Sequence, residues 1–296
     1  MAFSADQLLE KVNTYLATMP YVREPKGLYA PIEYVLSLGG KRIRPVLMLL
    51  SYQLYKENVD DILPQAAGNN MEVYVSVMRV DAALTVKEET DLKGRLSAAR
   101  QEKIDRLRYA ADRRLSLGAG LLLDQGLKRF GLRERTEAFA TVENGKPCLL
   151  HHPEIQFNLS HSGSMVMAAF SSCPVGCDVE KKQKARMDVA KRFFAPAEQR
   201  TLLAARTEEE RDILFSRLWT LKESYLKVGG QGMAMALGSF AITLGGQPVL
   251  DGTKESQYCF REFSLPGYCA SVCVQRREAG KGETFFFSFQ NLEDMV

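Results

Sequence analysis

The chain has little that would assign it to a membrane, to nucleic acid or to a secretory route. No stretch reaches the roughly 18 apolar residues that a membrane-spanning helix needs. The formal net charge is only +3 over 296 residues, which is too small to indicate a nucleic-acid partner. The first residues have neither a basic start nor an apolar segment, so no signal peptide is expected. These absences predict a cytoplasmic protein without a membrane or nucleic-acid partner.

The chain is also poor in residues that bind zinc. It has six cysteines, none in a C-x-x-C pair, and three histidines, so a zinc site is not expected. Most of the cysteines have apolar neighbours, which predicts reduced thiols in a core. The apolar fraction of 46% is ordinary for a globular protein, and the length allows two or three small domains.

One short acidic motif stands out against this background. Asp178 and Glu180 lie two residues apart in the segment V-G-C-D-V-E. In an extended strand, side chains at this spacing point to the same face. Two adjacent carboxylates repel each other unless a cation lies between them, and their oxygens suit a hard ion such as Mg²⁺. The alternative is a strand whose carboxylates are simply solvated.

A second acidic motif lies downstream in a helix-like segment. Glu223 belongs to the run W-T-L-K-E-S-Y-L-K, with Trp219 four residues before it and Lys227 four residues after it. Residues at this spacing share one face of a helix. This face combines a carboxylate, an ammonium group and an indole, which is unusual for a purely structural helix, although an exposed ion pair is the simpler interpretation.

Two upstream segments complete a pattern of four ordered motifs. These are G-K-P at 145–147 and F-N-L-S-H-S at 157–162. In this order the motifs resemble the 4′-phosphopantetheinyl transferases of the surfactin-synthetase-activating type, from about Met71 to beyond Cys273. The resemblance implies an α+β fold of two pseudo-twofold-related α+β subdomains, 71–173 and 174–296. It also implies transfer of phosphopantetheine from coenzyme A to a serine of an apo acyl or peptidyl carrier protein, with release of 3′,5′-ADP.

The resemblance further implies roles for the acidic motifs. Asp178, Glu180 and Glu223 would hold Mg²⁺, or Mn²⁺, and Glu180 could bind it directly or through water. Glu223 would be the general base for the acceptor serine, with Asp178 as the alternative. Lys227 would neutralise phosphate oxygens.

The same resemblance implies a set of residues that bind coenzyme A. Ser160 and His161 would bind the 3′-phosphate, although a lone histidine is more often structural. Lys222 would bind phosphate or be a surface charge, and the basic residues near 100–114 would bind phosphates or form a solvated helix face. The full set is Arg100, Lys103, Arg114, Lys146, Pro147, Asn158, Ser160, His161 and Lys222.

Residues 1–68 differ from the rest and are predicted to be helical, with Leu8, Val12 and Leu16 at helical spacing. The motif G-K-R-I-R-P at 40–45 resembles the beginning of trans-polyprenyl diphosphate synthases, which implies that Lys41 and Arg44 bind a diphosphate. The aspartate-rich motifs of that family do not follow. This piece is therefore predicted to be a truncated fragment without prenyl-transfer activity, or a helical appendage with a solvated basic loop.

Two rival functions follow from these patterns. One is a protein related to polyprenyl diphosphate synthases, and the other is a non-catalytic protein that binds coenzyme A or a carrier protein. The segment 191–194, K-R-F-F, could dock an acidic carrier protein, or its aromatics could belong to the core. Strands are expected at 71–77, 155–159, 165–170, 175–180, 240–244, 258–263, 268–274 and 284–289, and helices at 86–108, 111–130 and 208–228.

Overall fold

The computed structural model forms two compact units, residues 1–71 and 72–296. The structure describes residues 3–17, 46, 49–50, 71–141, 145–229, 237–245, 247–251, 257–276 and 283–296. None of the helices in this part of the chain has the length and apolar character that a membrane crossing requires.

In the first unit, the helix α1 (Ala5–Ala17) has the amphipathic pattern expected from its sequence. Leu8, Val12 and Leu16 are buried along one side of it and pack in a cluster with Val46 and Leu49. This confirms a helical start for the segment 1–68. The basic motif at 40–45, with Lys41 and Arg44, lies outside the described residues.

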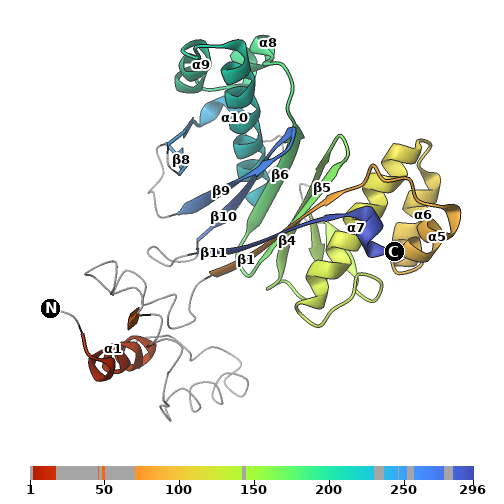
Figure 1. Ribbon diagram of the computed structural model, residues 1–296, viewed down its shortest axis with the longest axis horizontal. Helices are drawn as coiled ribbons and strands as arrows, with labels where there is room; N and C mark the ends of the chain where they lie inside the picture. The colour runs from red at the N-terminus through yellow and green to blue at the C-terminus, as the bar shows by residue number, and fades with distance from the viewer. Residues whose placement is uncertain are drawn as a thin grey trace. The chain divides into compact units, whose positions relative to one another are not determined.

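The second unit mixes helices and sheets, as expected for an α+β fold (Figure 1). Its first half contains β1 (Met71–Arg79), α5 (Val86–Lys93), α6 (Ala98–Arg106), α7 (Ala110–Lys128), β2 (Phe139–Thr141), β3 (Pro147–Leu149), β4 (Gln156–Ser162) and β5 (Met165–Ser171). Its second half contains β6 (Val175–Lys181), α8 (Met187–Phe193), α9 (Pro196–Leu203), α10 (Glu208–Val228), η3 (Leu237–Ser239), β7 (Ile242–Thr243), β8 (Val249–Leu250), β9 (Tyr258–Leu265), β10 (Tyr268–Gln275), β11 (Glu283–Asn291) and η4 (Leu292–Met295).

The two halves repeat one topology. In the first half, a strand and helices are followed by a hairpin whose last strand, β5, pairs with both β1 and β4. In the second half, the last strand of the corresponding hairpin, β10, pairs with both β6 and β9. Antiparallel neighbours in the same order therefore occur twice, which confirms the pseudo-twofold α+β architecture.

The C-terminal strand β11 joins the sheet of the first half. It lies beside β1 in the order β11-β1-β5-β4. The Ser288 and Ser76 hydroxyls are 2.8 Å apart, and the Phe286 ring stacks on Tyr74. The chain thus returns to the first half after building the second, and the subdomain limits 71–173 and 174–296 stay a prediction.

The sheets lie between two long helices. α7 packs against β5 and β4, whereas α10 packs against β6 and β10. Figure 1 shows these helices on opposite sides of the pair of sheets. The strands β4 and β6 lie next to each other, so the seam between the halves runs along them.

A glycine in β6 determines how closely α10 approaches its sheet. A Cβ atom on Gly176 would lie 2.1 Å from the Ser224 carbonyl oxygen and 2.7 Å from the Val228 nitrogen. Only glycine allows the helix backbone to pack so tightly on the strand. The contact brings the last turns of α10 directly over β6.

Most of the expected elements are present, with one correction. The single helix expected over 86–108 is two helices, because α5 ends near Gly94 and Ser97 caps α6 by accepting a hydrogen bond from the Arg100 N–H. The helices α8 and α9 and the hairpin of β2 and β3 were not predicted. Their segments are too short to show a clear periodicity.

Candidate active site

The face of β6 that is turned toward α10 carries both predicted carboxylates. Gly176, Asp178 and Glu180 alternate along the strand, and Gly176 is in contact with the α10 backbone. The three side-chain positions therefore share the face covered by the helix. α10 spans the predicted residues and brings Glu223 and Lys227 to the same region.

Asp178 is the most enclosed of the acidic residues, with 3% of its surface exposed. Its Oδ1 atom accepts hydrogen bonds from Lys227 Nζ at 2.6 Å and from the Ser160 hydroxyl at 2.8 Å. Its Oδ2 atom is buried and has no hydrogen-bond partner within the described part of the chain. A buried carboxylate oxygen without a partner is energetically expensive unless a ligand or cation satisfies it.

The environment of the site raises the pKa values of both Glu180 and Glu223. Burial raises the pKa of Glu223, the charges of Asp178 and Glu180 raise it further, and Lys227 opposes the rise. The pKa of Glu180 is also raised, mainly by burial, although the Ser162 hydroxyl donates to its carboxylate at 2.7 Å. The three carboxylates thus interact electrostatically with one another and with the ammonium group of Lys227.

Lys227 is held at this site by charge. Burial alone would lower its pKa, but Asp178 and other nearby acidic groups raise it above the ordinary value. Lys227 therefore stays protonated at neutral pH. One positive charge does not balance three carboxylates, so the site has an excess of negative charge when all three are ionised.

The described residues do not, however, form a ready-made chelating cluster. No group of three or more His, Cys, Asp or Glu side chains is gathered closely enough to hold a metal ion, in the region that the structure describes. Lys227 and Ser160 bond to the Asp178 Oδ1 atom, and Ser162 bonds to one carboxylate oxygen of Glu180. The unpartnered Asp178 Oδ2 fits an added hard cation, while the complete ligand set of Asp178, Glu180 and Glu223 stays a prediction.

The polar residues of β4 have a role that the sequence did not reveal. Their side chains accept hydrogen bonds from successive N–H groups of the neighbouring strand β6: Asn158 from Cys177 at 3.0 Å, Ser160 from Val179 at 3.4 Å, and Ser162 from Lys181 at 3.2 Å. The alternating polar pattern of this motif therefore joins the two halves of the second unit along the seam.

The assignments of Asn158 and Ser160 to coenzyme A stay predictions. Asn158 and Ser160 are 6% and 7% exposed, and their side chains are engaged with β6 and with Asp178. In the structure these two side chains hold the acidic strand in position. His161, between them, is exposed, and the alternation of the strand turns it away from the seam.

The structure does not support the prediction that Lys222 binds a phosphate or is a surface charge. Its side chain is fully buried, and its Nζ atom donates to both Glu198 carboxylate oxygens and to the Phe240 carbonyl oxygen, each at 2.8 Å. An ammonium group has three donors, so none is left for a phosphate. Lys222 instead locks α10 to α9 and to the segment before β7.

Lys146 joins the two halves from another direction. Its Nζ atom donates to the Val175 carbonyl oxygen at 2.8 Å and to the Val228 carbonyl oxygen at 3.0 Å. It therefore caps the end of α10 where β6 begins. Burial lowers the pKa of Lys146 to about 8.

Three of the predicted coenzyme A residues line one pocket beside β4. The pocket has a volume of about 220 Å³. Cations from α6 and apolar side chains from the strands form its wall: Ser97, Ala99, Arg100, Lys103, Leu123, Glu134, Phe139, Pro147, Phe157 and Leu159. The Arg100 Nε atom lies 3.4 Å from the buried Glu134 carboxylate. Arg114 of α7 is not among the residues that form this wall.

Sequence reasoning missed Ser162, Glu134 and Glu198. The regular spacing of Asn158, Ser160 and Ser162 was a visible signal for Ser162, because every second residue of the strand is polar. Glu134 and Glu198 had no such signal, since each acts on partners from other elements: Glu134 on α6 and Glu198 on α10.

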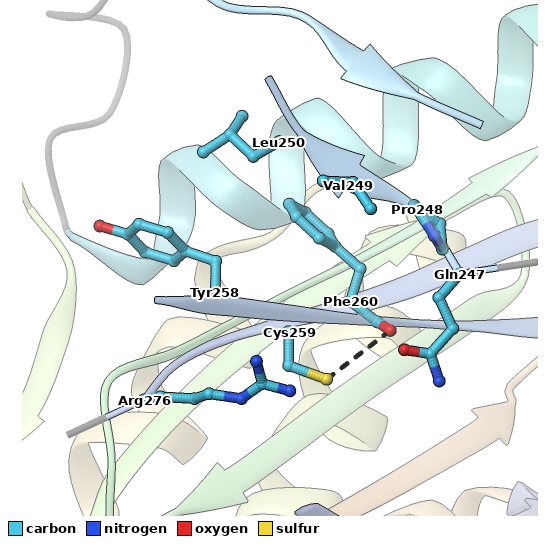
Figure 2. Close-up of a pocket in the computed structure, with 8 residues that line it drawn as sticks. All are labelled: Gln247, Pro248, Val249, Leu250, Tyr258, Cys259, Phe260 and Arg276. Atoms are coloured by element: carbon cyan, nitrogen blue, oxygen red, sulfur yellow. Dashed lines mark hydrogen bonds between the residues drawn. The ribbon is translucent and has the colours of Figure 1, made fainter. Parts of the chain in front are cut away.

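Another pocket lies between β8 and β9 (Figure 2). It has a volume of about 250 Å³, and Tyr258, Cys259, Phe260 and Arg276 line one side of it. The Cys259 thiol contacts the Phe260 carbonyl oxygen at 3.9 Å. None of the predicted site residues contributes to its wall, which separates it from the carboxylates.

Comparison with known proteins identifies relatives for both parts of the chain. The chain is 34% identical over 209 residues to the 4′-phosphopantetheinyl transferase Sfp of Bacillus subtilis (strain 168), covering 69% of this chain and 92% of that protein. It is also 34% identical over 211 residues to the 4′-phosphopantetheinyl transferase ffp of Bacillus subtilis, covering 70% and 93%. A third similarity, 40% identity over 61 residues, is to a short chain isoprenyl diphosphate synthase of Methanocaldococcus jannaschii, and covers 21% of this chain and 18% of that protein.

The third similarity accounts for the N-terminal region and spans less than a fifth of the synthase. The sequence model of the 4′-phosphopantetheinyl transferase superfamily matches residues 174–273, which include both acidic motifs. Together with the extended similarity to the Bacillus proteins, this match shows that the chain belongs to the 4′-phosphopantetheinyl transferase superfamily.

Proposed function

We propose that the protein transfers the 4′-phosphopantetheine group of coenzyme A to a serine hydroxyl of an apo acyl or peptidyl carrier protein, in a reaction that depends on Mg²⁺ and releases 3′,5′-ADP. The observation that carries this proposal is the unpartnered, buried Asp178 Oδ2 atom beside two further carboxylates. Such a site suits a divalent cation bound together with a diphosphate.

Asp178, Glu180 and Glu223 would hold the metal ion. Asp178 offers its free oxygen, and Ser160 and Lys227 fix the position of the other one. When bound, Mg²⁺ or Mn²⁺ would neutralise charge on the diphosphate oxygens. The affinity for the cation follows from the excess of negative charge around Lys227.

Glu223 is the candidate general base. Burial and its acidic neighbours raise its pKa, which makes its carboxylate a stronger proton acceptor than an exposed one. In the reaction, the serine oxygen bonds to the phosphorus that bears the pantetheine arm, and Glu223 takes the serine proton. The bond from that phosphorus to the bridging oxygen breaks, and 3′,5′-ADP leaves with the electron pair.

The 220 Å³ pocket is the candidate place for the nucleotide end of coenzyme A. It combines the Arg100 and Lys103 cations with the faces of Phe157 and Pro147. Cations suit the phosphates, and apolar walls suit a purine. The predicted contribution of Lys146 would come from its position next to this pocket, through Pro147.

The carrier protein would dock on exposed cations that follow the acidic strand. Lys181, Lys182, Lys184 and Arg186 are exposed, or nearly so, directly after Glu180, and Lys191 and Arg192 follow on α8. Carrier proteins are typically acidic, so this surface suits them by charge. Phe194 is 3% exposed and packs in the core, so the aromatic part of the predicted docking segment is structural.

A direct test incubates the full chain with coenzyme A, Mg²⁺ and a panel of apo carrier proteins, and follows each carrier by mass spectrometry. The expected result is a mass increase by one phosphopantetheine, abolished by a chelator and restored by Mg²⁺ or Mn²⁺. Glu223→Gln should lose at least about 100-fold in rate. Binding of coenzyme A without any transfer to a carrier would favour a non-catalytic binder and refute the proposal.

A further inference from the structure

Two serine hydroxyls of β4 bind the acidic strand by the same arrangement. The Ser160 hydroxyl donates a hydrogen bond to Asp178 Oδ1 at 2.8 Å and accepts one at 3.4 Å from the N–H of the residue after Asp178. The Ser162 hydroxyl donates to Glu180 Oε2 at 2.7 Å and accepts at 3.2 Å from the N–H of the residue after Glu180. The arrangement thus repeats with the two-residue period of a strand, and the way in which β4 lies beside β6 determines it.

The two carboxylates differ in how many side chains hold them. Asp178 Oδ1 is bonded to Ser160 and also to Lys227 Nζ, at 2.6 Å. Glu180 is only half-buried, and within the described residues Ser162 is the one side chain that forms a hydrogen bond to its carboxylate. A glutamate also has more rotamer freedom to lose than an aspartate. The position of the Glu180 carboxylate therefore depends on a single hydroxyl.

Each serine bonds to one carboxylate oxygen and leaves the other oxygen to a ligand. Asp178 Oδ2 is buried without a hydrogen-bond partner in the described part of the chain. Ser162 bonds to Glu180 Oε2, and no hydrogen bond between described residues involves Oε1. The hydroxyl is neutral, so it fixes the carboxylate without neutralising its charge. Carboxylates that bind metal ions are commonly oriented by hydrogen bonds of this kind.

On the basis of the proposed function, we propose that Ser162 is a positioning residue, which holds the Glu180 carboxylate in place for the divalent cation. Ser162 does not itself bind the cation. It belongs to the first half of the second unit, whereas Glu180 belongs to the second half. The acidic strand therefore supplies the charges of the site, and the neighbouring strand of the other half fixes where they lie.

The test removes the hydroxyl in Ser162→Ala and measures the Kd of Mn²⁺ for the full chain, from the electron paramagnetic resonance signal of free Mn²⁺ without coenzyme A or carrier protein. The Kd should rise by about tenfold, because loss of a hydrogen-bond partner of a metal ligand typically weakens binding 10- to 100-fold. Ser162→Thr retains the hydroxyl, and its Kd should stay within about twofold of that of the unmodified protein.

A double-mutant cycle separates positioning from a general effect on the strand. In a Glu180→Ala background, measured at higher Mn²⁺ concentrations, Ser162→Ala should change the Kd by less than about twofold, because no carboxylate is left to position. Ser76→Ala is the matched control. It removes a hydroxyl of β1 that lies 2.8 Å from the Ser288 hydroxyl, away from the acidic strand, and should leave the Kd of Mn²⁺ unchanged.

Four outcomes would overturn the inference. An unchanged or lower Kd in Ser162→Ala would show that the hydroxyl does not support the Glu180 carboxylate for the cation. A Kd in Ser162→Thr as high as in Ser162→Ala would show that the hydroxyl is not the group that matters. An equal tenfold effect in the Glu180→Ala background would assign the effect to the strand in general, and an unmodified protein that binds no Mn²⁺ would leave nothing to position.

The proposed function is tested separately, by the transfer assay. An unmodified protein that binds Mn²⁺ but modifies no carrier protein would refute the proposed function. The Kd values of the same variants would still decide whether Ser162 positions Glu180, since they are measured without any transfer.

Discussion

The two halves of the transferase region use one topology for opposite purposes. In the first half, Met78 of β1 and Val80 directly after this strand face α7 and are almost completely buried in an apolar cluster. In the second half, the β6 residues that face α10 are Gly176, Asp178 and Glu180. The same layer between strand and helix is therefore a core in one half and an acidic site in the other.

This difference shows how the second half tolerates buried charge. Its carboxylates lie near the end of α10, at the seam, where the side chains of β4 supply hydrogen bonds. Elsewhere on the same helix, Lys222 and Glu198 form a pair that is shielded from water. There the Lys222 ammonium group donates all of its hydrogen bonds to protein oxygens. Charge that is fully paired supports the fold, whereas charge that is left partly unpaired is available to a ligand.

The largest expected effect on stability concerns the buried pair. Glu198→Gln removes the charge that balances Lys222, whose side chain is fully buried, and should lower the free energy of unfolding by about 3–5 kcal/mol. Chemical denaturation measures this directly. In the first half, Asp124 of α7 pairs with Arg133, which is 38% exposed, and with Lys128, which is 50% exposed, so solvent compensates for much of its loss.

Asp124→Asn is therefore the matched variant, with an expected loss of about 1–2 kcal/mol. Equal losses in the two variants would contradict the distinction between a sealed pair in the second half and a solvated pair in the first.

The next prediction compares a variant that should lose activity with a variant that should lose stability. Asp178→Asn keeps the size of the side chain and removes the charge at the acidic site, and it should reduce the transfer rate by about 100- to 1,000-fold with little change in the circular dichroism spectrum. Met78→Ala, on the corresponding face of β1, should lower the free energy of unfolding by about 2–5 kcal/mol. The turnover number of its folded fraction should be that of the unmodified protein.

A transfer rate for Asp178→Asn within about tenfold of that of the unmodified enzyme would show that the Asp178 charge is not needed for transfer. A loss of turnover in folded Met78→Ala would show that the first half contributes more than a scaffold.

The stability of the fold should depend on pH through Lys146, which bonds to the end of α10 and the start of β6. Its pKa is about 8 in the folded protein, below the ordinary 10.5. The unfolded chain thus binds more protons between these values, and stability rises as pH increases from about 8 to 10.5, by at most about 1.4 kcal/mol per pH unit. The difference in free energy of unfolding between the unmodified protein and Lys146→Met, measured across this range, should show the rise. A difference that is constant with pH would show that Lys146 is solvated.

The local sequence pattern was enough to predict the strands and the strand face that carries the carboxylates. It was not enough to predict which lysine lies next to them. Asp178 and Glu180 could be placed together because their spacing of two residues determines their face within one strand. Lys222 and Lys227 are five residues apart, about 140° around the same helix, so only one of them can face the carboxylates. The choice depends on Glu198, which reaches Lys222 from another helix and leaves no trace in the local sequence.

The same reason explains Ser160 and Asn158. Their motif correctly identified the strand next to the acidic site, but the side chains are turned to the N–H groups of β6, a strand that follows later in the chain. Pairing between distant segments decides whether a polar residue supports a site or contacts a substrate.

The smallest expected effect extends the comparison to the N-terminal region. Lys41 and Arg44 belong to a basic motif that is similar to part of an isoprenyl diphosphate synthase, while Arg100 and Lys103 line the candidate nucleotide pocket. Because prenyl transfer needs metal-binding aspartates that the sequence lacks, the double variant Lys41→Ala/Arg44→Ala should change the KM for coenzyme A by less than about twofold. Arg100→Ala/Lys103→Ala removes the same number of charges and should raise this KM by about tenfold or more, since charge-assisted hydrogen bonds contribute about 1.5–3 kcal/mol each.

Measuring both variants at low and high salt separates a bound phosphate from general attraction, which salt screens. A large increase in KM for the N-terminal variant would mean that the N-terminal region takes part in binding coenzyme A. The two regions would then act together in one function instead of independently.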